Sequence, residues 1–389
     1  MGNIELFDSA WEFISTILVF LIGWVIALSI RLFFNCSIKR TTLLYCWHAF
    51  FSIIYALFIL KFGGDSYLYY LKAGIGYEGV HTSARIFGTP AVVYIALPFV
   101  SIFKLPFIGV CLVFHIFGFI GLLAFDASLR ATTRDKSQNI KLLSTIIVFL
   151  PSVSFWSSGL GKDAVSFMAV GLALWASLSL TKHIFLMVIA ITLMLLVRPH
   201  IAGIMVMSLA VAFILQKSIP LIYRVFLGII SLGVVAVLVP FALNYAGVGE
   251  NVDAEQLSEY IDGRQGLNSR GGSSLDISSM SLPMKLFTYM FRPLPFEAHS
   301  IASLMASLDN IALLYLFIVG SYYLIKNKLT PELKLHNRMF MWYYVIGAWG
   351  ILAMTTANLG ISVRQKWMIA PMLIFLLLSV IGNNKRSYV

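Results

Sequence analysis

Apolar stretches of near-membrane length follow one another along almost the whole chain, and this pattern constrains the fold more than any motif does. Of 389 residues, 59% are hydrophobic and only 12% are charged, whereas a typical soluble domain carries about 25% charged residues. A helix that crosses the hydrocarbon core of a bilayer needs about 20 mostly apolar residues. The sequence therefore predicts an all-α, polytopic transmembrane helical bundle, organised as a single integral membrane domain over residues 1–389.

Counting these stretches predicts about eleven membrane spans. They are Trp11–Phe34, Leu43–Leu60, Phe107–Phe125, Leu142–Phe155, Ala164–Leu180, His183–Val197, Ile201–Leu215, Leu221–Ala246, Ser300–Ile325, Met339–Thr356 and Trp367–Gly382. The first is expected to be a retained anchor, because its apolar run is too long for a signal peptide and no Lys or Arg precedes it. A further apolar stretch, Ala91–Phe103, is short and contains Pro98, so we expect it to be re-entrant or interfacial.

The distribution of Lys and Arg orients these spans, because short inner loops are enriched in both residues and short outer loops are depleted. The orientation that agrees best with this rule has the N-terminus outside, the segment Arg130–Lys141 inside and the C-terminus inside. The outer loops nevertheless keep a set of cations. They are Lys61, Lys72, Arg85, Lys162, Arg198, Arg264, Arg270, Lys285, Arg292, Arg364 and Lys366. Cations retained against this bias predict a bound anion of two or more charges, such as a diphosphate.

The net charge of +11 does not indicate nucleic acid, because single basic residues punctuate apolar stretches and no basic run lies in a polar domain. The three cysteines lie in or beside apolar stretches, which predicts neither a disulfide framework nor a thiolate metal site. No cofactor and no metal site is expected, although a divalent ion held by Asp65 beside a diphosphate is left open as an alternative.

The first outer loop, Gly63–Tyr70, carries the candidate catalytic base. Two glycines let the backbone leave the preceding helix sharply, and Asp65 then lies at the water interface. Its carboxylate would act as a general base on an acceptor hydroxyl, while Tyr67 and Tyr70 would contact sugar rings. The alternative interpretation is a helix cap followed by an aromatic belt.

Two tight outer turns offer phosphate-binding groups. The turn Phe155–Asp163 is rich in Ser and Gly and opens a helix, whose N-terminus attracts phosphate oxygens, and Lys162 adds charge. Trp156 would contact a sugar, as would His200 of the second turn. Arg198 and His200 lie in the second turn, where a charge must face a wet cavity or a partner. A plain tight turn at Lys162 and a hydrogen-bonded structural His200 are the alternatives.

The outer loop 247–299 is a candidate lid over the substrate. Its Gly-, Ser- and Asn-rich middle carries Arg264 and Arg270. Its end carries Arg292, which suits a bidentate phosphate contact, and Glu297, a second candidate base. A simple ion pair between Arg292 and Glu297 is an equally good interpretation.

The last outer cations precede the final span. Arg364 completes the candidate diphosphate-binding set, whereas snorkelling to the headgroups is the default for any one cation in this position. Asp309 is the one acid well inside a span. Such residues are usually paired, and Arg198 or Arg364 are the candidate partners.

These features resemble two families of membrane enzymes. The many spans, the large outer loop with paired arginines and the scattered outer arginines resemble O-antigen and exopolysaccharide polymerases of the Wzy type. Asp65, within Gly64-Asp65-Ser66-Tyr67 and followed by Tyr70, resembles the acid in the first outer loop of GT-C glycosyltransferases. Both families use polyprenyl-linked sugars at the outer face of the membrane.

The resemblance implies a polymerase that joins undecaprenyl-diphosphate-linked oligosaccharide repeat units of O-antigen, capsule or exopolysaccharide at the outer face of a bacterial inner membrane. The expected partners are the polyprenyl-linked glycan, membrane lipids, and a chain-length regulator and flippase of the same pathway. Three alternatives are left open. They are a GT-C-like transferase of a single sugar from a polyprenyl-phosphate donor, a transporter or flippase of lipid-linked glycans, and a structural assembly subunit.

Overall fold

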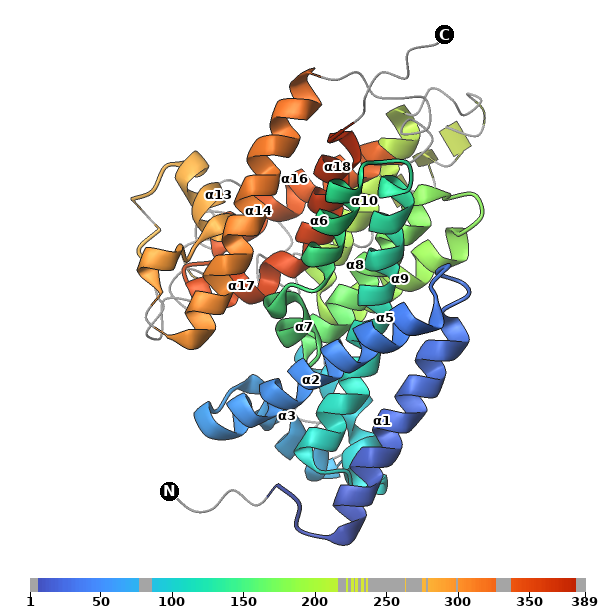
Figure 1. The fold of residues 1–389 in the computed structure, drawn as a ribbon, viewed down its shortest axis with the longest axis vertical. Helices are drawn as coiled ribbons and strands as arrows, with labels where there is room; N and C mark the ends of the chain where they lie inside the picture. The colour runs from blue at the N-terminus through green and yellow to red at the C-terminus, as the bar shows by residue number, and fades with distance from the viewer. Residues whose placement is uncertain are drawn as a thin grey trace. The chain divides into compact units, whose positions relative to one another are not determined.

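The computed structural model describes residues 6–76, 86–215, 275–277, 279–298, 300–326 and 337–382, with isolated residues between 222 and 263. The regular elements in these ranges are helices, and no strand occurs among them (Figure 1). The expected all-α class is therefore confirmed.

The helices follow the apolar stretches of the sequence. In chain order they are α1 (Ala10–Ile30), α2 (Ile38–Phe62), α3 (Asp65–Gly74), α4 (Thr89–Leu97), the π-helical turn η2 (Pro98–Ile102), α5 (Phe107–Thr133), α6 (Gln138–Val148), α7 (Pro151–Ser157), α8 (Lys162–Leu178), α9 (Ile184–Val197), α10 (Pro199–Leu215), α13 (Leu282–Phe291), the 3₁₀ turn η3 (Pro295–Glu297), α14 (Ile301–Lys326), α16 (Arg338–Thr355), α17 (Leu359–Gln365), the 3₁₀ turn η4 (Lys366–Met368) and α18 (Ala370–Val380). Serine hydroxyls cap the first two helices, because Ser9 accepts from the Glu12 amide and Ser37 from the Arg40 amide.

Among the described residues, five helical stretches are long and apolar enough to cross a membrane, which fits a helical membrane protein. They are α1, α2, α5, the α6–α7 stretch Gln138–Ser157, and Ser303–Lys326 in α14. A sixth span results if the pair Leu359–Met368 and Ala370–Val380 is taken together, although the two helices meet at a 62° bend.

The expected number of about eleven spans is not reproduced within these described ranges. The stretches His183–Val197 and Ile201–Leu215 form α9 and α10, which have 14 and 17 residues. A 14-residue helix is only about 21 Å long, whereas the hydrocarbon core is about 30 Å thick. The stretch Ala164–Leu180 forms α8, which also has 17 residues. The expected span Leu221–Ala246 lies outside the described residues, apart from isolated positions.

The chain divides into two compact units. The first unit comprises residues 1–127, 148–172 and 192–198. The second unit comprises residues 128–147, 173–191 and 199–389. Each is described by itself below.

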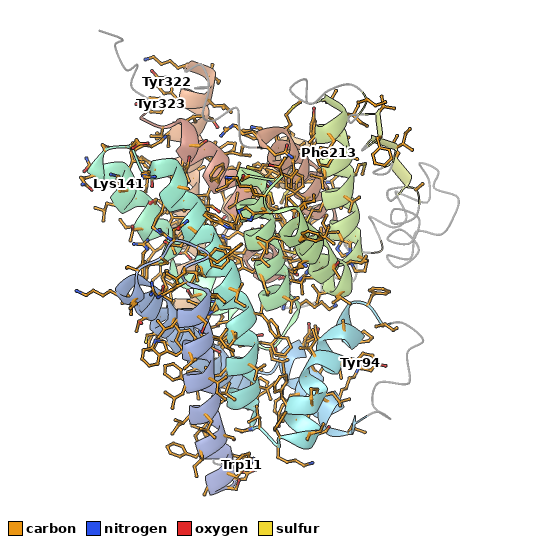
Figure 2. All side chains as sticks on the ribbon, turned by 90° about the vertical axis from the view of Figure 1, so that its right-hand side faces the viewer. Trp11, Tyr94, Lys141, Phe213, Tyr322 and Tyr323 are labelled. Atoms are coloured by element: carbon orange, nitrogen blue, oxygen red, sulfur yellow. The ribbon has the colours of Figure 1, made fainter. Side chains whose placement is uncertain are left out.

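The first unit is held together by polar contacts at both ends of its long helices. Trp11 lies at the start of α1 (Figure 2), and its indole N–H donates to the Phe103 carbonyl at 2.9 Å. Farther along, Asp126 of α5 is fully buried and accepts three hydrogen bonds of 2.6–3.1 Å from the Arg40 guanidinium of α2. A buried carboxylate requires such a partner, so this pair fixes α2 against α5.

Two glycines allow α5 and α8 to approach closely in the first unit. A Cβ atom at Gly171 would overlap the Gly121 carbonyl oxygen, and a Cβ at Gly121 would lie 2.7 Å from the Met168 Cα. Both contacts are with backbone, which cannot rotate away. Small residues at such crossings are typical of helices that pack within membranes.

Replacing Gly171 by Ala is therefore expected to destabilise the protein by about 1–3 kcal/mol, because the added methyl group must push two backbones apart. The measurement is the unfolding temperature of the purified protein in detergent, followed by tryptophan fluorescence. Gly350→Ala in α16 is the matched control, since a Cβ atom there would have no described neighbour within 4 Å. An equal unfolding temperature for the two variants would contradict the close approach.

The second unit packs α18 against α14 and α16. At Gly320 of α14, a Cβ atom would lie 2.6 Å from the Leu377 Cβ of α18. Tyr322 and Tyr323 lie toward the C-terminal end of α14 (Figure 2). The face of α14 opposite Gly320 leaves apolar side chains exposed, as expected for a surface that faces lipid.

Two cations hold the C-terminal end of α18. The Lys136 ammonium donates to the carbonyls of Leu378, Ser379 and Ile381 at 3.0, 2.6 and 2.5 Å. Arg338, the first residue of α16, donates to the Ser379 hydroxyl at 2.6 Å. The last carbonyls of a helix have no partners within it and carry partial negative charge, so both cations stabilise this helix end.

Candidate functional site

The junction between α2 and α3 presents Asp65 to solvent. Gly63 and Gly64 have φ angles of 78° and 149°, which side chains rarely tolerate, and the Gly63 amide donates to the Ile59 carbonyl as α2 ends. Asp65 is the first residue of α3 and its side chain is exposed. The expected sharp turn after α2 is therefore present, and it leaves the candidate base accessible.

Tyr55 joins this junction to the turn that opens α8. Its hydroxyl lies 2.5 Å from the Ser66 Oγ. A Cβ at Gly159 would overlap the Tyr55 ring, so only glycine fits there, and a Cβ at Gly161 would lie 4.0 Å from the Ser66 Oγ. The start of α3 and the turn 158–161 therefore lie side by side. We call the group formed by Asp65, Ser66, Gly161, Lys162, Asp163 and Arg198 the Asp65 site.

Arg198 reaches the start of α8 from the end of α9. Its Nη2 lies 2.6 Å from the Asp163 Oδ1, and the two side chains are only 8% and 17% exposed. Asp163 belongs to the first turn of α8, where the helix dipole favours a negative charge. Lys162 is half-buried beside it. Asp163 is therefore the partner that the charge of Arg198 requires in this turn. The sequence analysis did not predict this pairing.

Two of the aromatic candidates, Tyr67 and Tyr70, form an aromatic wall with Phe107 beside the Asp65 site. The rings of Tyr67 and Tyr70 stack with centroids 6.1 Å apart, and both pack nearly perpendicular to the ring of Phe107. The Tyr70 hydroxyl donates to the Leu105 carbonyl, and burial raises the pKa of this phenol to about 12, with a smaller contribution from the charge of Glu12. Tyr67 is 37% exposed and is the more accessible of the two for a sugar.

Trp156 lies on α7, next to Tyr55. Its ring packs edge-on against Phe155 at 4.8 Å and against Tyr55 at 6.3 Å. It is half-buried, so part of its surface stays accessible.

In the second unit, Arg292 and Glu297 form the ion pair that the sequence left open. Arg292 Nη2 and Nε lie 2.6 and 2.8 Å from the Glu297 Oε1, and the Leu294 amide donates to the Oε2 at 2.8 Å. Glu297 therefore holds the turn after α13 closed, and accepting a proton would cost it these bonds. Of the two candidate bases, Asp65 is the more available.

A fully buried polar cluster lies next to this turn. Asn310 of α14 donates to the Pro293 carbonyl at 2.9 Å and accepts from the Lys366 ammonium. Asp309 also interacts electrostatically with Lys366. The sequence analysis named Arg198 or Arg364 as partners of Asp309 and counted Lys366 only among the outer cations, whereas the structure buries Lys366 fully. It did not predict the contact of Lys366 with Asn310, because 56 residues separate the two.

The other predicted site residues are distributed as follows. Arg364 is half-buried on α17, and His200 is half-buried at the second position of α10, both in the second unit. Arg264 and Arg270 lie outside the described residues, as does most of the candidate lid 247–299. The end of that loop forms α13, whose last turn is buried against α14 and α16.

Within the described ranges, no group of three or more His, Cys, Asp and Glu side chains is placed to hold a metal ion. Comparison of the chain with protein families, with curated proteins and with solved structures gave no match.

Proposed function

We propose that this chain is a glycosyltransferase of the polysaccharide polymerase type, which joins undecaprenyl-diphosphate-linked oligosaccharide repeat units at the outer face of the bacterial inner membrane. One observation carries the proposal. An exposed carboxylate, Asp65, lies beside a Gly-rich turn that opens α8 with Lys162, and the buried Arg198 reaches the same place. A base beside groups that stabilise phosphate is what glycosyl transfer from a diphosphate requires.

The reaction forms a bond between the anomeric carbon of the donor glycan and a hydroxyl oxygen of the acceptor glycan. The bond between that carbon and the diphosphate oxygen breaks, and its electron pair leaves with undecaprenyl diphosphate. Asp65 takes the proton of the acceptor hydroxyl. Negative charge grows on the leaving oxygen in the transition state, where Lys162, Arg198 and the N-terminus of α8 would stabilise it.

Polymerisation differs from transfer of a single sugar in needing two diphosphate-linked lipids, one as donor and one as acceptor. Each unit of the chain carries two of the candidate phosphate-binding cations. The first has Lys162 and Arg198, and the second has Arg292 and Arg364. Tyr67 and Trp156 would provide ring faces for the sugars. Four candidate cations would suit the two diphosphates that a polymerase binds better than the single monophosphate donor of the alternative transferase.

The orientation inferred from the charge pattern remains part of this proposal. Within the second unit, two cations expected inside, Lys136 and Arg338, meet at the C-terminal end of α18. Lys366, a cation expected outside, immediately precedes the N-terminal end of the same helix. Separation of the two sets along one helix supports a common orientation for the helices of this unit.

The proposal predicts that cells lacking this chain lose long glycans and keep single repeat units on the lipid carrier. The measurement is a gel of extracted glycans from deleted cells with and without the wild-type gene. Restoration of the full ladder by the wild type supports a polymerase. A truncated repeat unit in the deleted cells would instead indicate a single-sugar transferase, and an unchanged ladder would rule out both.

Transport of lipid-linked glycans is the second candidate, and one observation favours it. The chain bends by 62° between Leu359–Met368 and Ala370–Val380, with the fully buried Lys366 in the first of these segments. Broken helices with buried polar groups form substrate sites in many transporters. A transporter makes no glycosidic bond, so purified protein that extends glycans in the absence of other enzymes would exclude it as the sole activity.

A further inference from the structure

Three polar side chains, Asp309, Asn310 and Lys366, are fully buried in the second unit. Ionised groups within a membrane domain are costly to bury, and those that persist usually serve a function. Lys366 and Asp309 carry opposite charges, and their attraction offsets part of this cost. The attraction does not account for Asn310, which lies between Lys366 and the turn.

Asn310 connects Lys366 to the Arg292 turn, which we define as residues 292–297. Its Oδ1 accepts from the Lys366 ammonium, and its Nδ2 donates to the Pro293 carbonyl at 2.9 Å. Since the lysine can only donate, it fixes which side of the amide faces Pro293. The turn itself is closed by Glu297, which binds the Arg292 guanidinium and the Leu294 amide.

Lys366 is itself held in a fixed position. It lies in the short η4 turn before α18, where its carbonyl accepts from the Ile369 amide at 2.9 Å. Two residues later, the Met368 carbonyl accepts from the buried Tyr344 hydroxyl at 2.9 Å. The network therefore runs from the bend between α17 and α18, through α14, to the turn that carries Arg292.

We infer that Lys366 and Asn310 are positioning residues, which hold the Arg292 turn so that its guanidinium meets the diphosphate of a lipid-linked glycan. This inference rests on the proposed function. Neither residue touches the substrate. Lys366 orients the Asn310 amide, and that amide anchors the backbone beside Arg292. A guanidinium held in place beforehand loses less entropy when it binds a phosphate.

The test compares three variants of the full-length protein in lipid nanodiscs. Lys366→Met removes the charge that orients the amide. Asn310→Asp keeps an acceptor for Lys366 but removes the amide donor to Pro293, and it adds a carboxyl group beside the buried Asp309. Lys136→Met is the matched control, because it removes another lysine that donates to carbonyls of the same unit, at the other end of α18.

Three quantities are measured for each variant: the unfolding temperature, the affinity for undecaprenyl diphosphate, and amide hydrogen exchange in residues 292–298. Lys366→Met and Asn310→Asp are expected to weaken binding by at least about tenfold, as expected for the loss of one well-placed guanidinium contact. The amides of Glu297 and Ala298, which donate within the turn, should exchange faster. Lys136→Met should lower the unfolding temperature with neither effect.

Unchanged exchange and affinity in Asn310→Asp would overturn the inference, as would losses that merely parallel the fall in unfolding temperature across all three variants. If the wild type fails to bind undecaprenyl diphosphate, the proposed function fails instead. Faster exchange in Lys366→Met and Asn310→Asp alone would in that case still support the positioning of the turn by this network.

Discussion

Asp65→Asn is expected to stop glycan extension while the protein stays folded. The asparagine has the same shape but cannot take a proton, and loss of a general base slows such reactions by about 10²- to 10⁴-fold. Asp65 is exposed and makes no hydrogen bond through its carboxylate to another described residue. Its removal therefore costs little more than one charge at the start of α3, about 0.3–1 kcal/mol. The measurement is the glycan ladder of complemented cells, with protein level and unfolding temperature alongside.

Asp8→Asn is the control for this substitution. Asp8 is another exposed carboxylate of the first unit, and its negative charge contributes to the raised pKa of Tyr70 in the aromatic wall. The two variants thus remove the same charge from neighbouring parts of the unit. A normal ladder from Asp65→Asn would exclude Asp65 as the base. If both variants lose glycan extension equally, the effect is due to the change in overall charge.

The sequence predicts the helices well because burial in an apolar medium is a local property of a stretch of residues. The first expected span, Trp11–Phe34, corresponds to α1 (Ala10–Ile30), and Leu43–Leu60 lies within α2 (Ile38–Phe62). Helix length is harder to predict from hydropathy, because a proline or a buried lysine can end a helix inside an apolar region. Pro199 starts a new helix directly after α9, and η4 separates α17 from α18.

The candidate site is predictable where its residues are neighbours in the chain. Two glycines before Asp65 indicate the turn, and a spacing of five residues with two prolines indicates the pair of Arg292 and Glu297. The pairing of Arg198 with Asp163 spans 35 residues. Such a partner is selected by how helices pack, and an apolar sequence carries little information on which helices are neighbours.

Arg198→Met is expected to reduce both stability and glycan extension, whereas Arg198→Met with Asp163→Asn should recover only the stability. The single change removes the Arg198 cation from a mostly buried carboxylate, and loss of one partner from a buried pair costs about 3–5 kcal/mol. The N-terminus of α8 still favours the charge of Asp163, so the cost should fall toward the lower end of that range. Neutralising both residues removes the charge that Arg198 balances. It does not restore a cation for the leaving diphosphate, so extension should stay low by about 10²-fold or more.

This double-mutant cycle separates the two roles that a buried arginine can have, because stability and turnover respond to different partners. If Arg198 serves only to neutralise Asp163, the double variant will recover extension together with the unfolding temperature, and the anion-binding role will be excluded. If Arg198 also stabilises the diphosphate, the two measurements will diverge. Asp163→Asn alone then provides a further check, since it frees the guanidinium from its carboxylate. The Asp163→Asn variant should bind undecaprenyl diphosphate more tightly than the wild type. A weaker affinity would show that Asp163 orients Arg198 and does not compete with the diphosphate for it.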